Sequence, residues 1–289
     1  MENYASKEWF ERGKYLDLLN HNIFLVEEGS GEPLILLHGF PTSSWDWHKI
    51  LPTLTSTHTV IAPDFLGFGF SDKPHSAAYS ISTQADIIEA IIEHYGFSPL
   101  HILAHDYGDT VAQELLARQQ SNSYQIMTVA LLNGGLFPET HRPVIIQKLL
   151  ISPLGPIISK LITKKKFENS FSAVFGENSK PSQNELDVFW EIMNYNNGLS
   201  NYHKLIRYMK ERKTQREKWV RALQDHKGQL SLINGLEDPV SGRHMVDRYR
   251  ALVSMENIYA LEEIGHYPQT ESPQQVLEAY LDFRNRLGN

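Results

Sequence analysis

Short apolar runs alternate with longer amphipathic stretches along this chain. The apolar runs are rich in valine, isoleucine and leucine without strict polar alternation, which is typical of strands buried on both faces of a sheet. They predict strands at 23–27, 34–38, 60–63, 101–105, 126–133, 229–234 and 257–261. Alternation of such strands with helices predicts the α/β class, with a mostly parallel central sheet flanked by helices.

Three amphipathic stretches predict helices of the core, at 80–95, 109–120 and 273–287. In the first, four isoleucines and Tyr95 fall on one face. Ser80 or Ser82 is suited to cap its beginning, and Gly96 ends it. Pro273 suits the first turn of the last helix.

Residues 137–225 break this alternation. The stretch is helix-prone, is interrupted by prolines and glycines, and carries 15 Lys/Arg against 9 Asp/Glu, whereas the rest of the chain carries 12 against 25. We interpret 137–225 as an inserted helical lid on a core made of 1–136 and 226–289. We interpret the excess of basic residues in this segment as a solvated helix surface, in preference to a site for an anionic partner or a membrane surface.

Composition narrows the function classes. The 289 residues are 41% hydrophobic, enough for one large core, and none is cysteine, which excludes disulfides and thiolate chemistry. No apolar run approaches the roughly 20 residues that span a bilayer, and the first residues lack a signal-peptide pattern, so we expect a cytoplasmic protein. No metal, cofactor or nucleic-acid motif appears, and the glycines of 64–71 fit a dinucleotide fingerprint poorly.

The most informative chemistry follows the strand at 101–105. Residues 104–108 read AHDYG, the small-x-nucleophile-x-small pattern of an α/β-hydrolase elbow, with Asp106 where serine is usual. A carboxylate nucleophile attacks a saturated carbon with a leaving group and forms an alkyl ester, which water then hydrolyses. Asp106 alone also fits an ordinary helix cap.

Two further residues complete a catalytic triad in the chain order of this fold. His266, between the last strand and the last helix, is the expected general base. Asp238, which follows the strand at 229–234, is expected to orient it, with Glu237 as the local rival. An earlier acid position known in such proteins falls near Asn133, which is neutral. Structural roles for the histidine and a turn role for the aspartate are the alternatives.

The segment HGFP at 38–41 ends another predicted strand. In this fold, the corresponding loop supplies one backbone N–H of the oxyanion hole, here from Phe40. The residue after the nucleophile, Tyr107, supplies the other.

Together these segments resemble the aspartate-nucleophile branch of the α/β-hydrolases, which includes epoxide hydrolases and haloalkane dehalogenases. More narrowly, the chain resembles the mesoderm-specific transcript proteins. The similar stretches are HGFPTSSWDW (38–47), DFLGFGFSDKP (64–74), HDYGDTVAQELL (105–116), NGGLFPETHRP (133–143) and HYPQ (266–269). The resemblance runs from about residue 23 onward and implies an α/β-hydrolase fold with an epoxide-hydrolase-like activity.

Epoxide opening needs a strong hydrogen-bond donor, whereas halide release uses weak donors such as a Trp indole beside the nucleophile. The resemblance implies a lid tyrosine as donor, with Tyr202 first and Tyr208 in reserve, and Tyr107 stands where the indole would be. We therefore expect hydrolysis of a small apolar epoxide without a cofactor, in a pocket that includes Phe40, Tyr107, Trp45 and Phe137 from their loop positions. The alternatives are a dehalogenase with the same triad and a non-catalytic scaffold that docks through the basic run 204–221. The oligomeric state is open.

Overall fold

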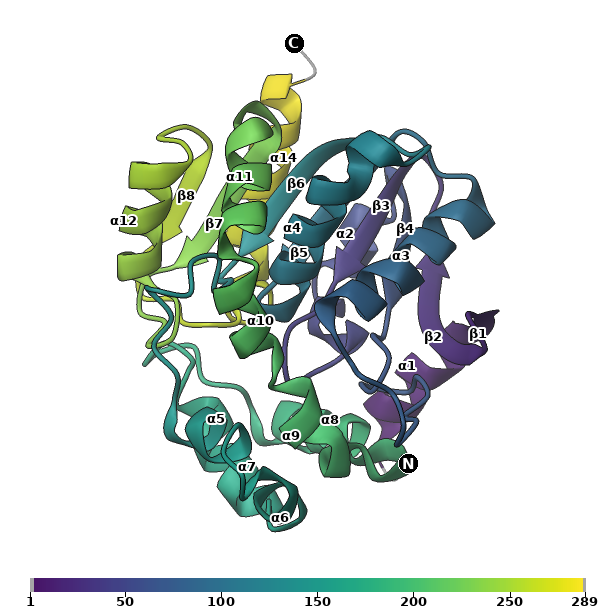
Figure 1. Cartoon of the computed structure of the whole chain (residues 1–289), viewed down its shortest axis with the longest axis vertical. Coiled ribbons are helices and arrows are strands. Elements are labelled where there is room, and N and C mark those ends of the chain that lie inside the picture. The colour runs from purple at the N-terminus through teal and green to yellow at the C-terminus, as the bar shows by residue number, and fades with distance from the viewer. Residues whose placement is uncertain (1–2, 288–289) are drawn as a thin grey trace.

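The computed structural model describes residues 3–287. These residues form one eight-stranded sheet in the order β1-β2-β4-β3-β5-β6-β7-β8 (Figure 1). β2 pairs antiparallel with β1 and β4, and all other neighbours are parallel. The strands are β1 Gly13–Leu18, β2 His21–Glu28, β3 Glu32–Leu37, β4 His58–Pro63, β5 Leu100–His105, β6 Ile126–Leu132, β7 Leu230–Gly235 and β8 Ile258–Leu261.

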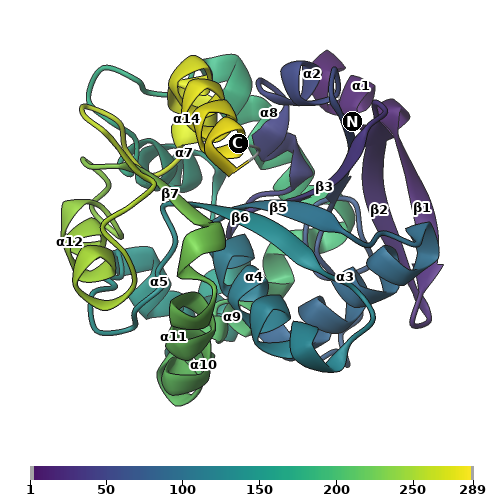
Figure 2. The ribbon, with the colours of Figure 1, turned by 90° about the horizontal axis from the view of Figure 1, so that it is seen from above.

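Helices cover both faces of this sheet. Figure 2 shows α3, α4 and α11 on one face and α2 and α14 on the other. The helices are α1 Tyr4–Arg12, α2 Leu51–Leu54, α3 Ile81–Tyr95, α4 Tyr107–Arg118, α5 Ile145–Leu150, α6 Gly155–Lys160, α7 Lys164–Ser172, α8 Gln183–Asn194, α9 Tyr202–Leu205, α10 Tyr208–Thr214, α11 Arg216–Asp225, α12 Arg243–Leu252, α13 Pro268–Glu271 and α14 Pro273–Leu287. Short 3₁₀ helices are η1 Ser44–Trp47, η2 Gln119–Ser121, η3 Tyr195–Asn201 and η4 Lys227–Gln229.

The predicted α/β fold is confirmed, because each of the seven predicted strands coincides with an observed one. All six residues of β5 are buried, as its apolar pattern requires. Helix α3 begins where the hydroxyl of Ser80 accepts a hydrogen bond from the N–H of Thr83 and ends at Gly96, whose φ is 64°. Edge strand β1 escaped prediction because most of its side chains are at least partly exposed.

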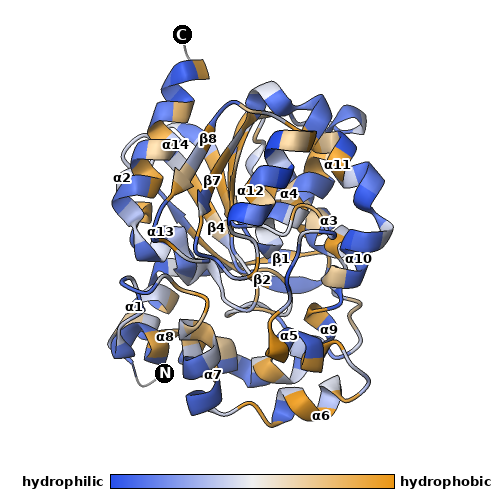
Figure 3. Ribbon diagram, turned by 90° about the vertical axis from the view of Figure 1, so that its left-hand side faces the viewer, coloured by the Kyte–Doolittle hydropathy of each residue, from blue (hydrophilic) through white to orange (hydrophobic). Residues whose placement is uncertain are grey.

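The helices of residues 137–225, the segment expected to be an insertion, fall into two groups. Helices α5 to α9 lie at the carboxyl end of the parallel strands, below the sheet in Figure 3, and pack largely on one another. Helix α11 instead packs along α4 of the core. Because α10 directly precedes α11, the position of α11 also determines where α10 lies.

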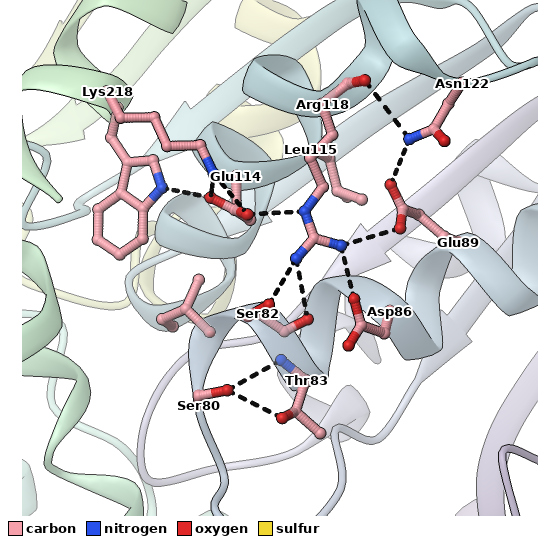
Figure 4. Close-up of polar contacts among 12 residues, drawn as sticks. Ser80, Ser82, Thr83, Asp86, Glu89, Glu114, Leu115, Arg118, Asn122 and Lys218 are labelled. Atoms are coloured by element: carbon pink, nitrogen blue, oxygen red, sulfur yellow. Dashed lines mark hydrogen bonds and ion pairs between the residues drawn. The ribbon is translucent and has the colours of Figure 1, made fainter.

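A polar network fixes α11 to α4 (Figure 4). The buried carboxylate of Glu114 accepts hydrogen bonds from Lys218 and from the indole of Trp219, both on α11. It also pairs with Arg118, which reaches the carboxylates of Asp86 and Glu89 on α3. Because each charge in this network has an opposite partner, a largely buried carboxylate is tolerated between the helices.

Candidate active site

Asp106 stands at the sharp turn between β5 and α4. Its backbone has φ 44° and ψ −96°, a conformation that residues with side chains rarely adopt and that costs energy. Gly108 lets the turn approach β3, because a Cβ there would lie 2.2 Å from the carbonyl oxygen of Leu37. The turn therefore holds the Asp106 carboxylate at the carboxyl end of the sheet, where the first turn of α4 begins.

His266 and Asp238 form a hydrogen-bonded pair at the same end of the sheet. His266 Nδ1 lies 2.7 Å from Asp238 Oδ2, and Glu237 is exposed, which makes Asp238 the partner of the imidazole. Three further donors bond to the Asp238 carboxylate: Asn133 Nδ2 at 3.0 Å, Ser241 Oγ at 2.8 Å and the Val240 N–H at 2.7 Å. Asn133, the neutral residue at the alternative acid position, thus stabilises the carboxylate of Asp238 by a hydrogen bond.

The charges of this pair are strongly coupled. Burial acts against the imidazolium of His266, but the charge and hydrogen bond of Asp238, together with the charge of Asp106, outweigh burial and raise the pKa of His266 to about 9. Burial likewise acts against the carboxylate of Asp238, but His266 outweighs it and the pKa of Asp238 falls to about 2. The imidazole therefore holds a proton readily while Asp106 is ionised.

The loop after β3 brings a backbone donor to Asp106. The N–H of Phe40 donates to Asp106 Oδ2 at 3.3 Å. Tyr107 is the first residue of α4, and its ring is fully buried against Phe65 and Phe68. Of the two residues predicted for an oxyanion hole, Phe40 therefore forms a hydrogen bond to the Asp106 carboxylate, and Tyr107 is the next residue in the chain.

Sequence reasoning missed Arg212, which lies directly at the nucleophile position. Its Nη2 donates to the carbonyl oxygen of Asp106 at 3.1 Å and lies 3.4 Å from Asp106 Oδ1, while its Nε donates to Thr110 Oγ1 at 2.8 Å. The guanidinium is 4.5 Å from the ring centroid of Tyr208, and the whole side chain is only 2% exposed. Its sequence signal is weak, because Arg212 is one of many basic residues in the inserted segment.

Tyr202 and Tyr208, the two tyrosines expected to act as donors from a lid, differ in how their hydroxyls are hydrogen-bonded. Tyr202 donates to the carbonyl oxygen of Pro41 at 2.8 Å. The hydroxyl of Tyr208 is buried and has no hydrogen-bond partner among residues 3–287, while its ring packs 4.9 Å from that of Tyr107. Burial, and then the charge of Asp106, raise the pKa of Tyr208, so this hydroxyl keeps its proton and is free to donate it.

An apolar cavity of about 80 Å³ reaches the site from the side of helices α5 and α7. Phe40, Tyr202, His266 and Tyr267 line it together with aliphatic and aromatic lid residues. Trp45 and Phe137 are not among the lining residues. Trp45 stacks on His48 and meets the edge of Phe189, and Phe137 is fully buried.

The family described as alpha/beta hydrolase fold matches residues 32–273 of the chain. The chain therefore belongs to the α/β-hydrolase fold family. It is also 42% identical over 295 residues to the mesoderm-specific transcript homolog protein of Bos taurus, a match that covers 97% of this chain and 88% of that protein. The resemblance to the mesoderm-specific transcript proteins is thus confirmed.

Two further comparisons agree with this family. The putative hydrolase LipZ of Mycobacterium tuberculosis is 35% identical over 285 residues, which cover 97% of this chain and 98% of LipZ. The solved structure of a haloalkane dehalogenase DbeA-M1 loop variant from Bradyrhizobium elkanii has a TM-score of 0.79 at 19% identity, covering 96% of this chain and 98% of the other, and supports the fold. The family match and the similarity to LipZ support an enzyme of the hydrolase class.

Residues 3–287 hold no group of three or more histidines, aspartates and glutamates arranged to bind a metal ion. None of the helices formed by these residues combines the length and the apolar character that a membrane crossing demands.

Proposed function

We propose that this chain hydrolyses epoxides to diols through a covalent ester on Asp106. The observation that carries the proposal is the arrangement around Asp106: a carboxylate at a strained elbow, a backbone donor from Phe40, and the His266–Asp238 pair. Residues 137–225, proposed as the lid, supply the tyrosines and most of the apolar wall.

In the first step, a carboxylate oxygen of Asp106 attacks a ring carbon of the epoxide. A carbon–oxygen bond forms, the ring carbon–oxygen bond breaks, and its electron pair moves to the ring oxygen. That oxygen takes the proton of a tyrosine hydroxyl. We assign Tyr208 as the donor, since its hydroxyl is free, whereas Tyr202 already donates to Pro41.

In the second step, His266 takes a proton from water, whose oxygen attacks the carbonyl carbon of the Asp106 ester. The N–H groups of Phe40 and Tyr107 are placed to donate to the resulting oxyanion. The intermediate then collapses, the ester bond between the carbonyl carbon and the alkyl oxygen breaks, the leaving alkoxide takes the proton held by His266, and the diol leaves. The carboxylic acid formed on Asp106 gives its proton to the Tyr208 phenolate left by the first step, so that both Asp106 and Tyr208 are regenerated.

The coupling between the charges of Asp106 and His266 is consistent with ester formation first and ester hydrolysis second. The charge of Asp106 helps to raise the pKa of His266, and this charge disappears when the ester forms. The pKa of His266 is therefore lower in the ester than in the free enzyme. The imidazole becomes available as a base at the stage where a base is needed.

The second candidate is a haloalkane dehalogenase with the same triad. Halide departure relies on weak donors at the nucleophile, and here the neighbours are the tyrosine hydroxyl of Tyr208 and the side chain of Tyr107. A phenolic donor suits an alkoxide, which must be protonated, so epoxide opening is favoured. A scaffold role is disfavoured because the paired imidazole and carboxylate stand ready beside the nucleophile.

The size of the apolar cavity limits what the closed structure can accept. A cavity of about 80 Å³ is roughly half of the ~150 Å³ that holds benzene in an apolar protein core. Larger epoxides therefore require helices of the lid to move outward. The network around Glu114 holds α11 to the core, so we expect this outward movement in the segment from α5 to α7, whose residues line the apolar cavity, and not in α11.

The proposal is tested by intact-protein mass spectrometry of His266→Gln incubated with a panel of epoxides and haloalkanes. Without its base the enzyme forms the ester but fails to hydrolyse it. We expect an adduct with the mass of an intact epoxide, mapped to Asp106. His94→Gln, on the exposed face of α3, is the matched control and should accumulate no adduct.

An alkyl adduct that lacks halogen, with no epoxide adduct, would select the dehalogenase. The absence of any adduct in a well-folded variant, together with the absence of turnover by the unchanged protein on the same panel, would contradict both.

A further inference from the structure

Arg212 is one of the residues that line a second cavity, of about 280 Å³. Its charged lining is basic: Arg212, Lys148, Lys210 and Lys213, with His141 beside Arg212. Prolines and apolar side chains complete the wall, and none of its described lining residues carries a carboxylate. This cationic cavity differs in character from the apolar cavity that His266 lines.

At the inner end of the cationic cavity, buried donors lack acceptors. Arg212 Nη1 is buried without a hydrogen-bond partner among residues 3–287, and so are both ring nitrogens of His141. The two groups are neighbours, because a Cβ on Gly135 would lie 2.2 Å from Arg212 Nη1 and 3.0 Å from His141 Nδ1. A buried charged donor without an acceptor is costly, and a bound anion removes that cost.

His141 takes part as a neutral donor. Burial, and then the charge of Arg212, lower the pKa of His141 to about 4, so the ring is uncharged near neutral pH. A neutral imidazole carries one N–H, which can point to an anion beside the guanidinium. The charge for anion binding then comes from Arg212 and its orientation from both groups.

At the outer end, Lys148, Lys210 and Lys213 are exposed. None of the three forms an ion pair with the residues from 3 to 287. The acidic neighbour Glu139 pairs with Arg216 and Arg248 instead. Unpaired cations around a cavity mouth raise the local concentration of anions and speed their entry.

The cationic cavity is connected to the chemistry through one side chain. Arg212 lines the cationic cavity, and Nη2 of its guanidinium lies 3.4 Å from Asp106 Oδ1. Helix α5 separates the two cavities, with Gln147 and Leu150 on the apolar side and Lys148 on the cationic side. Phe40, which lines the apolar cavity, and Arg212, which lines the cationic cavity, both contact the Asp106 carboxylate. A molecule with its reactive carbon at Asp106 can extend an acid group toward Arg212 and a hydrocarbon arm toward the apolar cavity.

We propose that the substrate is an amphiphilic epoxide with an anionic acid group, carboxylate or phosphate, close to the oxirane ring, and that Arg212 and His141 bind this group. The inference rests on the proposed epoxide hydrolysis for the oxirane, but the anion site stands on its own contacts. Nε of Arg212 donates to Thr110 and Nη2 to Asp106, so Nη1 is the guanidinium nitrogen left for a ligand. An acid group can accept a charge-assisted hydrogen bond from Nη1 and a second one from His141, whereas a neutral amide or alcohol lacks the negative charge that strengthens this pairing.

The anion site is tested by calorimetric titration with unreactive probes: hexanoate, hexyl phosphate and the neutral hexanamide. The unchanged protein should bind at least one of the acids and bind hexanamide at least tenfold more weakly. Arg212→Gln should weaken acid binding by about 10- to 100-fold, since a hydrogen bond to a charged group is lost. Arg221→Gln, an exposed change of the same net charge on α11, should leave binding unaltered.

Equal binding of hexanamide and hexanoate, or unchanged acid binding by a folded Arg212→Gln variant, would overturn the anion site. Whichever of hexanoate and hexyl phosphate binds more tightly identifies the acid group of the substrate. If Arg212→Gln fails to fold, the exposed pair Lys210→Gln/Lys213→Gln serves instead. It should weaken acid binding about threefold or more at low salt and much less at high salt, and the absence of a low-salt effect would count against the proposal.

A parallel experiment separates this inference from the proposed function. The His266→Gln variant is incubated with trans-2,3-epoxyhexanoate and with 1,2-epoxyhexane, and ester formation is followed by mass. If the ester forms faster from the epoxy acid than from 1,2-epoxyhexane, and this difference is lost in His266→Gln/Arg212→Gln, both the proposed function and the anion site are supported. Esters formed equally from both epoxides contradict the acid-bearing substrate while keeping the function. Acid binding without any ester contradicts the function and leaves the anion site.

Discussion

Asp106 is contacted by residues that line two cavities of opposite character. On one side, Phe40 and His266 belong to an apolar cavity with aromatic walls. On the other side, Arg212 belongs to a larger cavity with a basic lining. In the function proposed above, one nucleophile serves a substrate with two ends. The core loops supply the groups for bond making and hydrolysis, and Arg212 on α10 supplies the positive charge.

The largest effect should come from the residue that both sides share. Asp106→Ala removes the nucleophile, so turnover of every epoxide should fall below detection, while the far-ultraviolet circular dichroism spectrum stays unchanged. Removal of the carboxylate also leaves the buried guanidinium of Arg212 without its ion-pair partner, so the melting temperature should fall although the variant stays folded. Residual turnover with the same substrate range would show that another group attacks the epoxide.

The second largest effect on turnover should come from Asp238, which orients the catalytic base His266 on the apolar side. Asp238→Asn removes the charge that orients His266, and ester hydrolysis should slow by about 10²- to 10⁴-fold. The same change lowers the pKa of His266, because Asp238 is the main group that raises it.

The pH profile gives the sign of this effect. His266 must be unprotonated to act as a base, so the rate of ester hydrolysis should rise with pH to a plateau. The pKa of His266 is about 9 while Asp106 is charged, and the ester removes that charge, so the plateau should begin at a pH below 9. In Asp238→Asn the plateau should be lower and should begin at a more acidic pH. Single-turnover decay of the ester across pH measures both; a profile unmoved by the substitution would contradict the pairing.

The lid tyrosines sharpen the comparison further. Tyr208→Phe should slow ester formation by about 10- to 100-fold, because the only change is loss of a free buried hydroxyl near Asp106. Tyr202→Phe should cost only a few-fold, and its main effect should be about 1 kcal/mol of stability from the lost bond to Pro41. Pre-steady-state rates for the two variants decide, and the reverse order would move the donor role to Tyr202.

The smallest catalytic effect should come from the anchor of α11. Glu114→Gln leaves Lys218 and Arg118 without their buried partner, so the melting temperature should fall by a few degrees, which corresponds to about 1–2 kcal/mol. Turnover should change little at temperatures where the protein is folded. Glu139→Gln, which weakens exposed ion pairs, is the control and should shift the melting temperature less.

Local patterns explain why the core of the site could be predicted. The elbow, the acid and the histidine each follow a strand, and parallel strands bring their carboxyl ends to one edge. Asp238 and Glu237 were separable because adjacent residues of a turn face opposite ways, one buried and one exposed.

Long-range packing explains what prediction missed. Arg212 meets Asp106 across 106 positions in sequence, and this contact depends on how α11 docks on α4. The free hydroxyl of Tyr208 and the bonded one of Tyr202 likewise follow from the lid fold. Edge strand β1 was missed because half-exposed positions leave no apolar run.

The most direct test of the central claim is a single turnover of an epoxide by excess enzyme in ¹⁸O-labelled water. If Asp106 attacks the ring carbon, the oxygen added to the first diol comes from the carboxylate, so that diol is unlabelled and the label appears in Asp106. If the first diol carries the label and Asp106 does not, water attacks the epoxide directly, and the account of Asp106 as nucleophile is wrong.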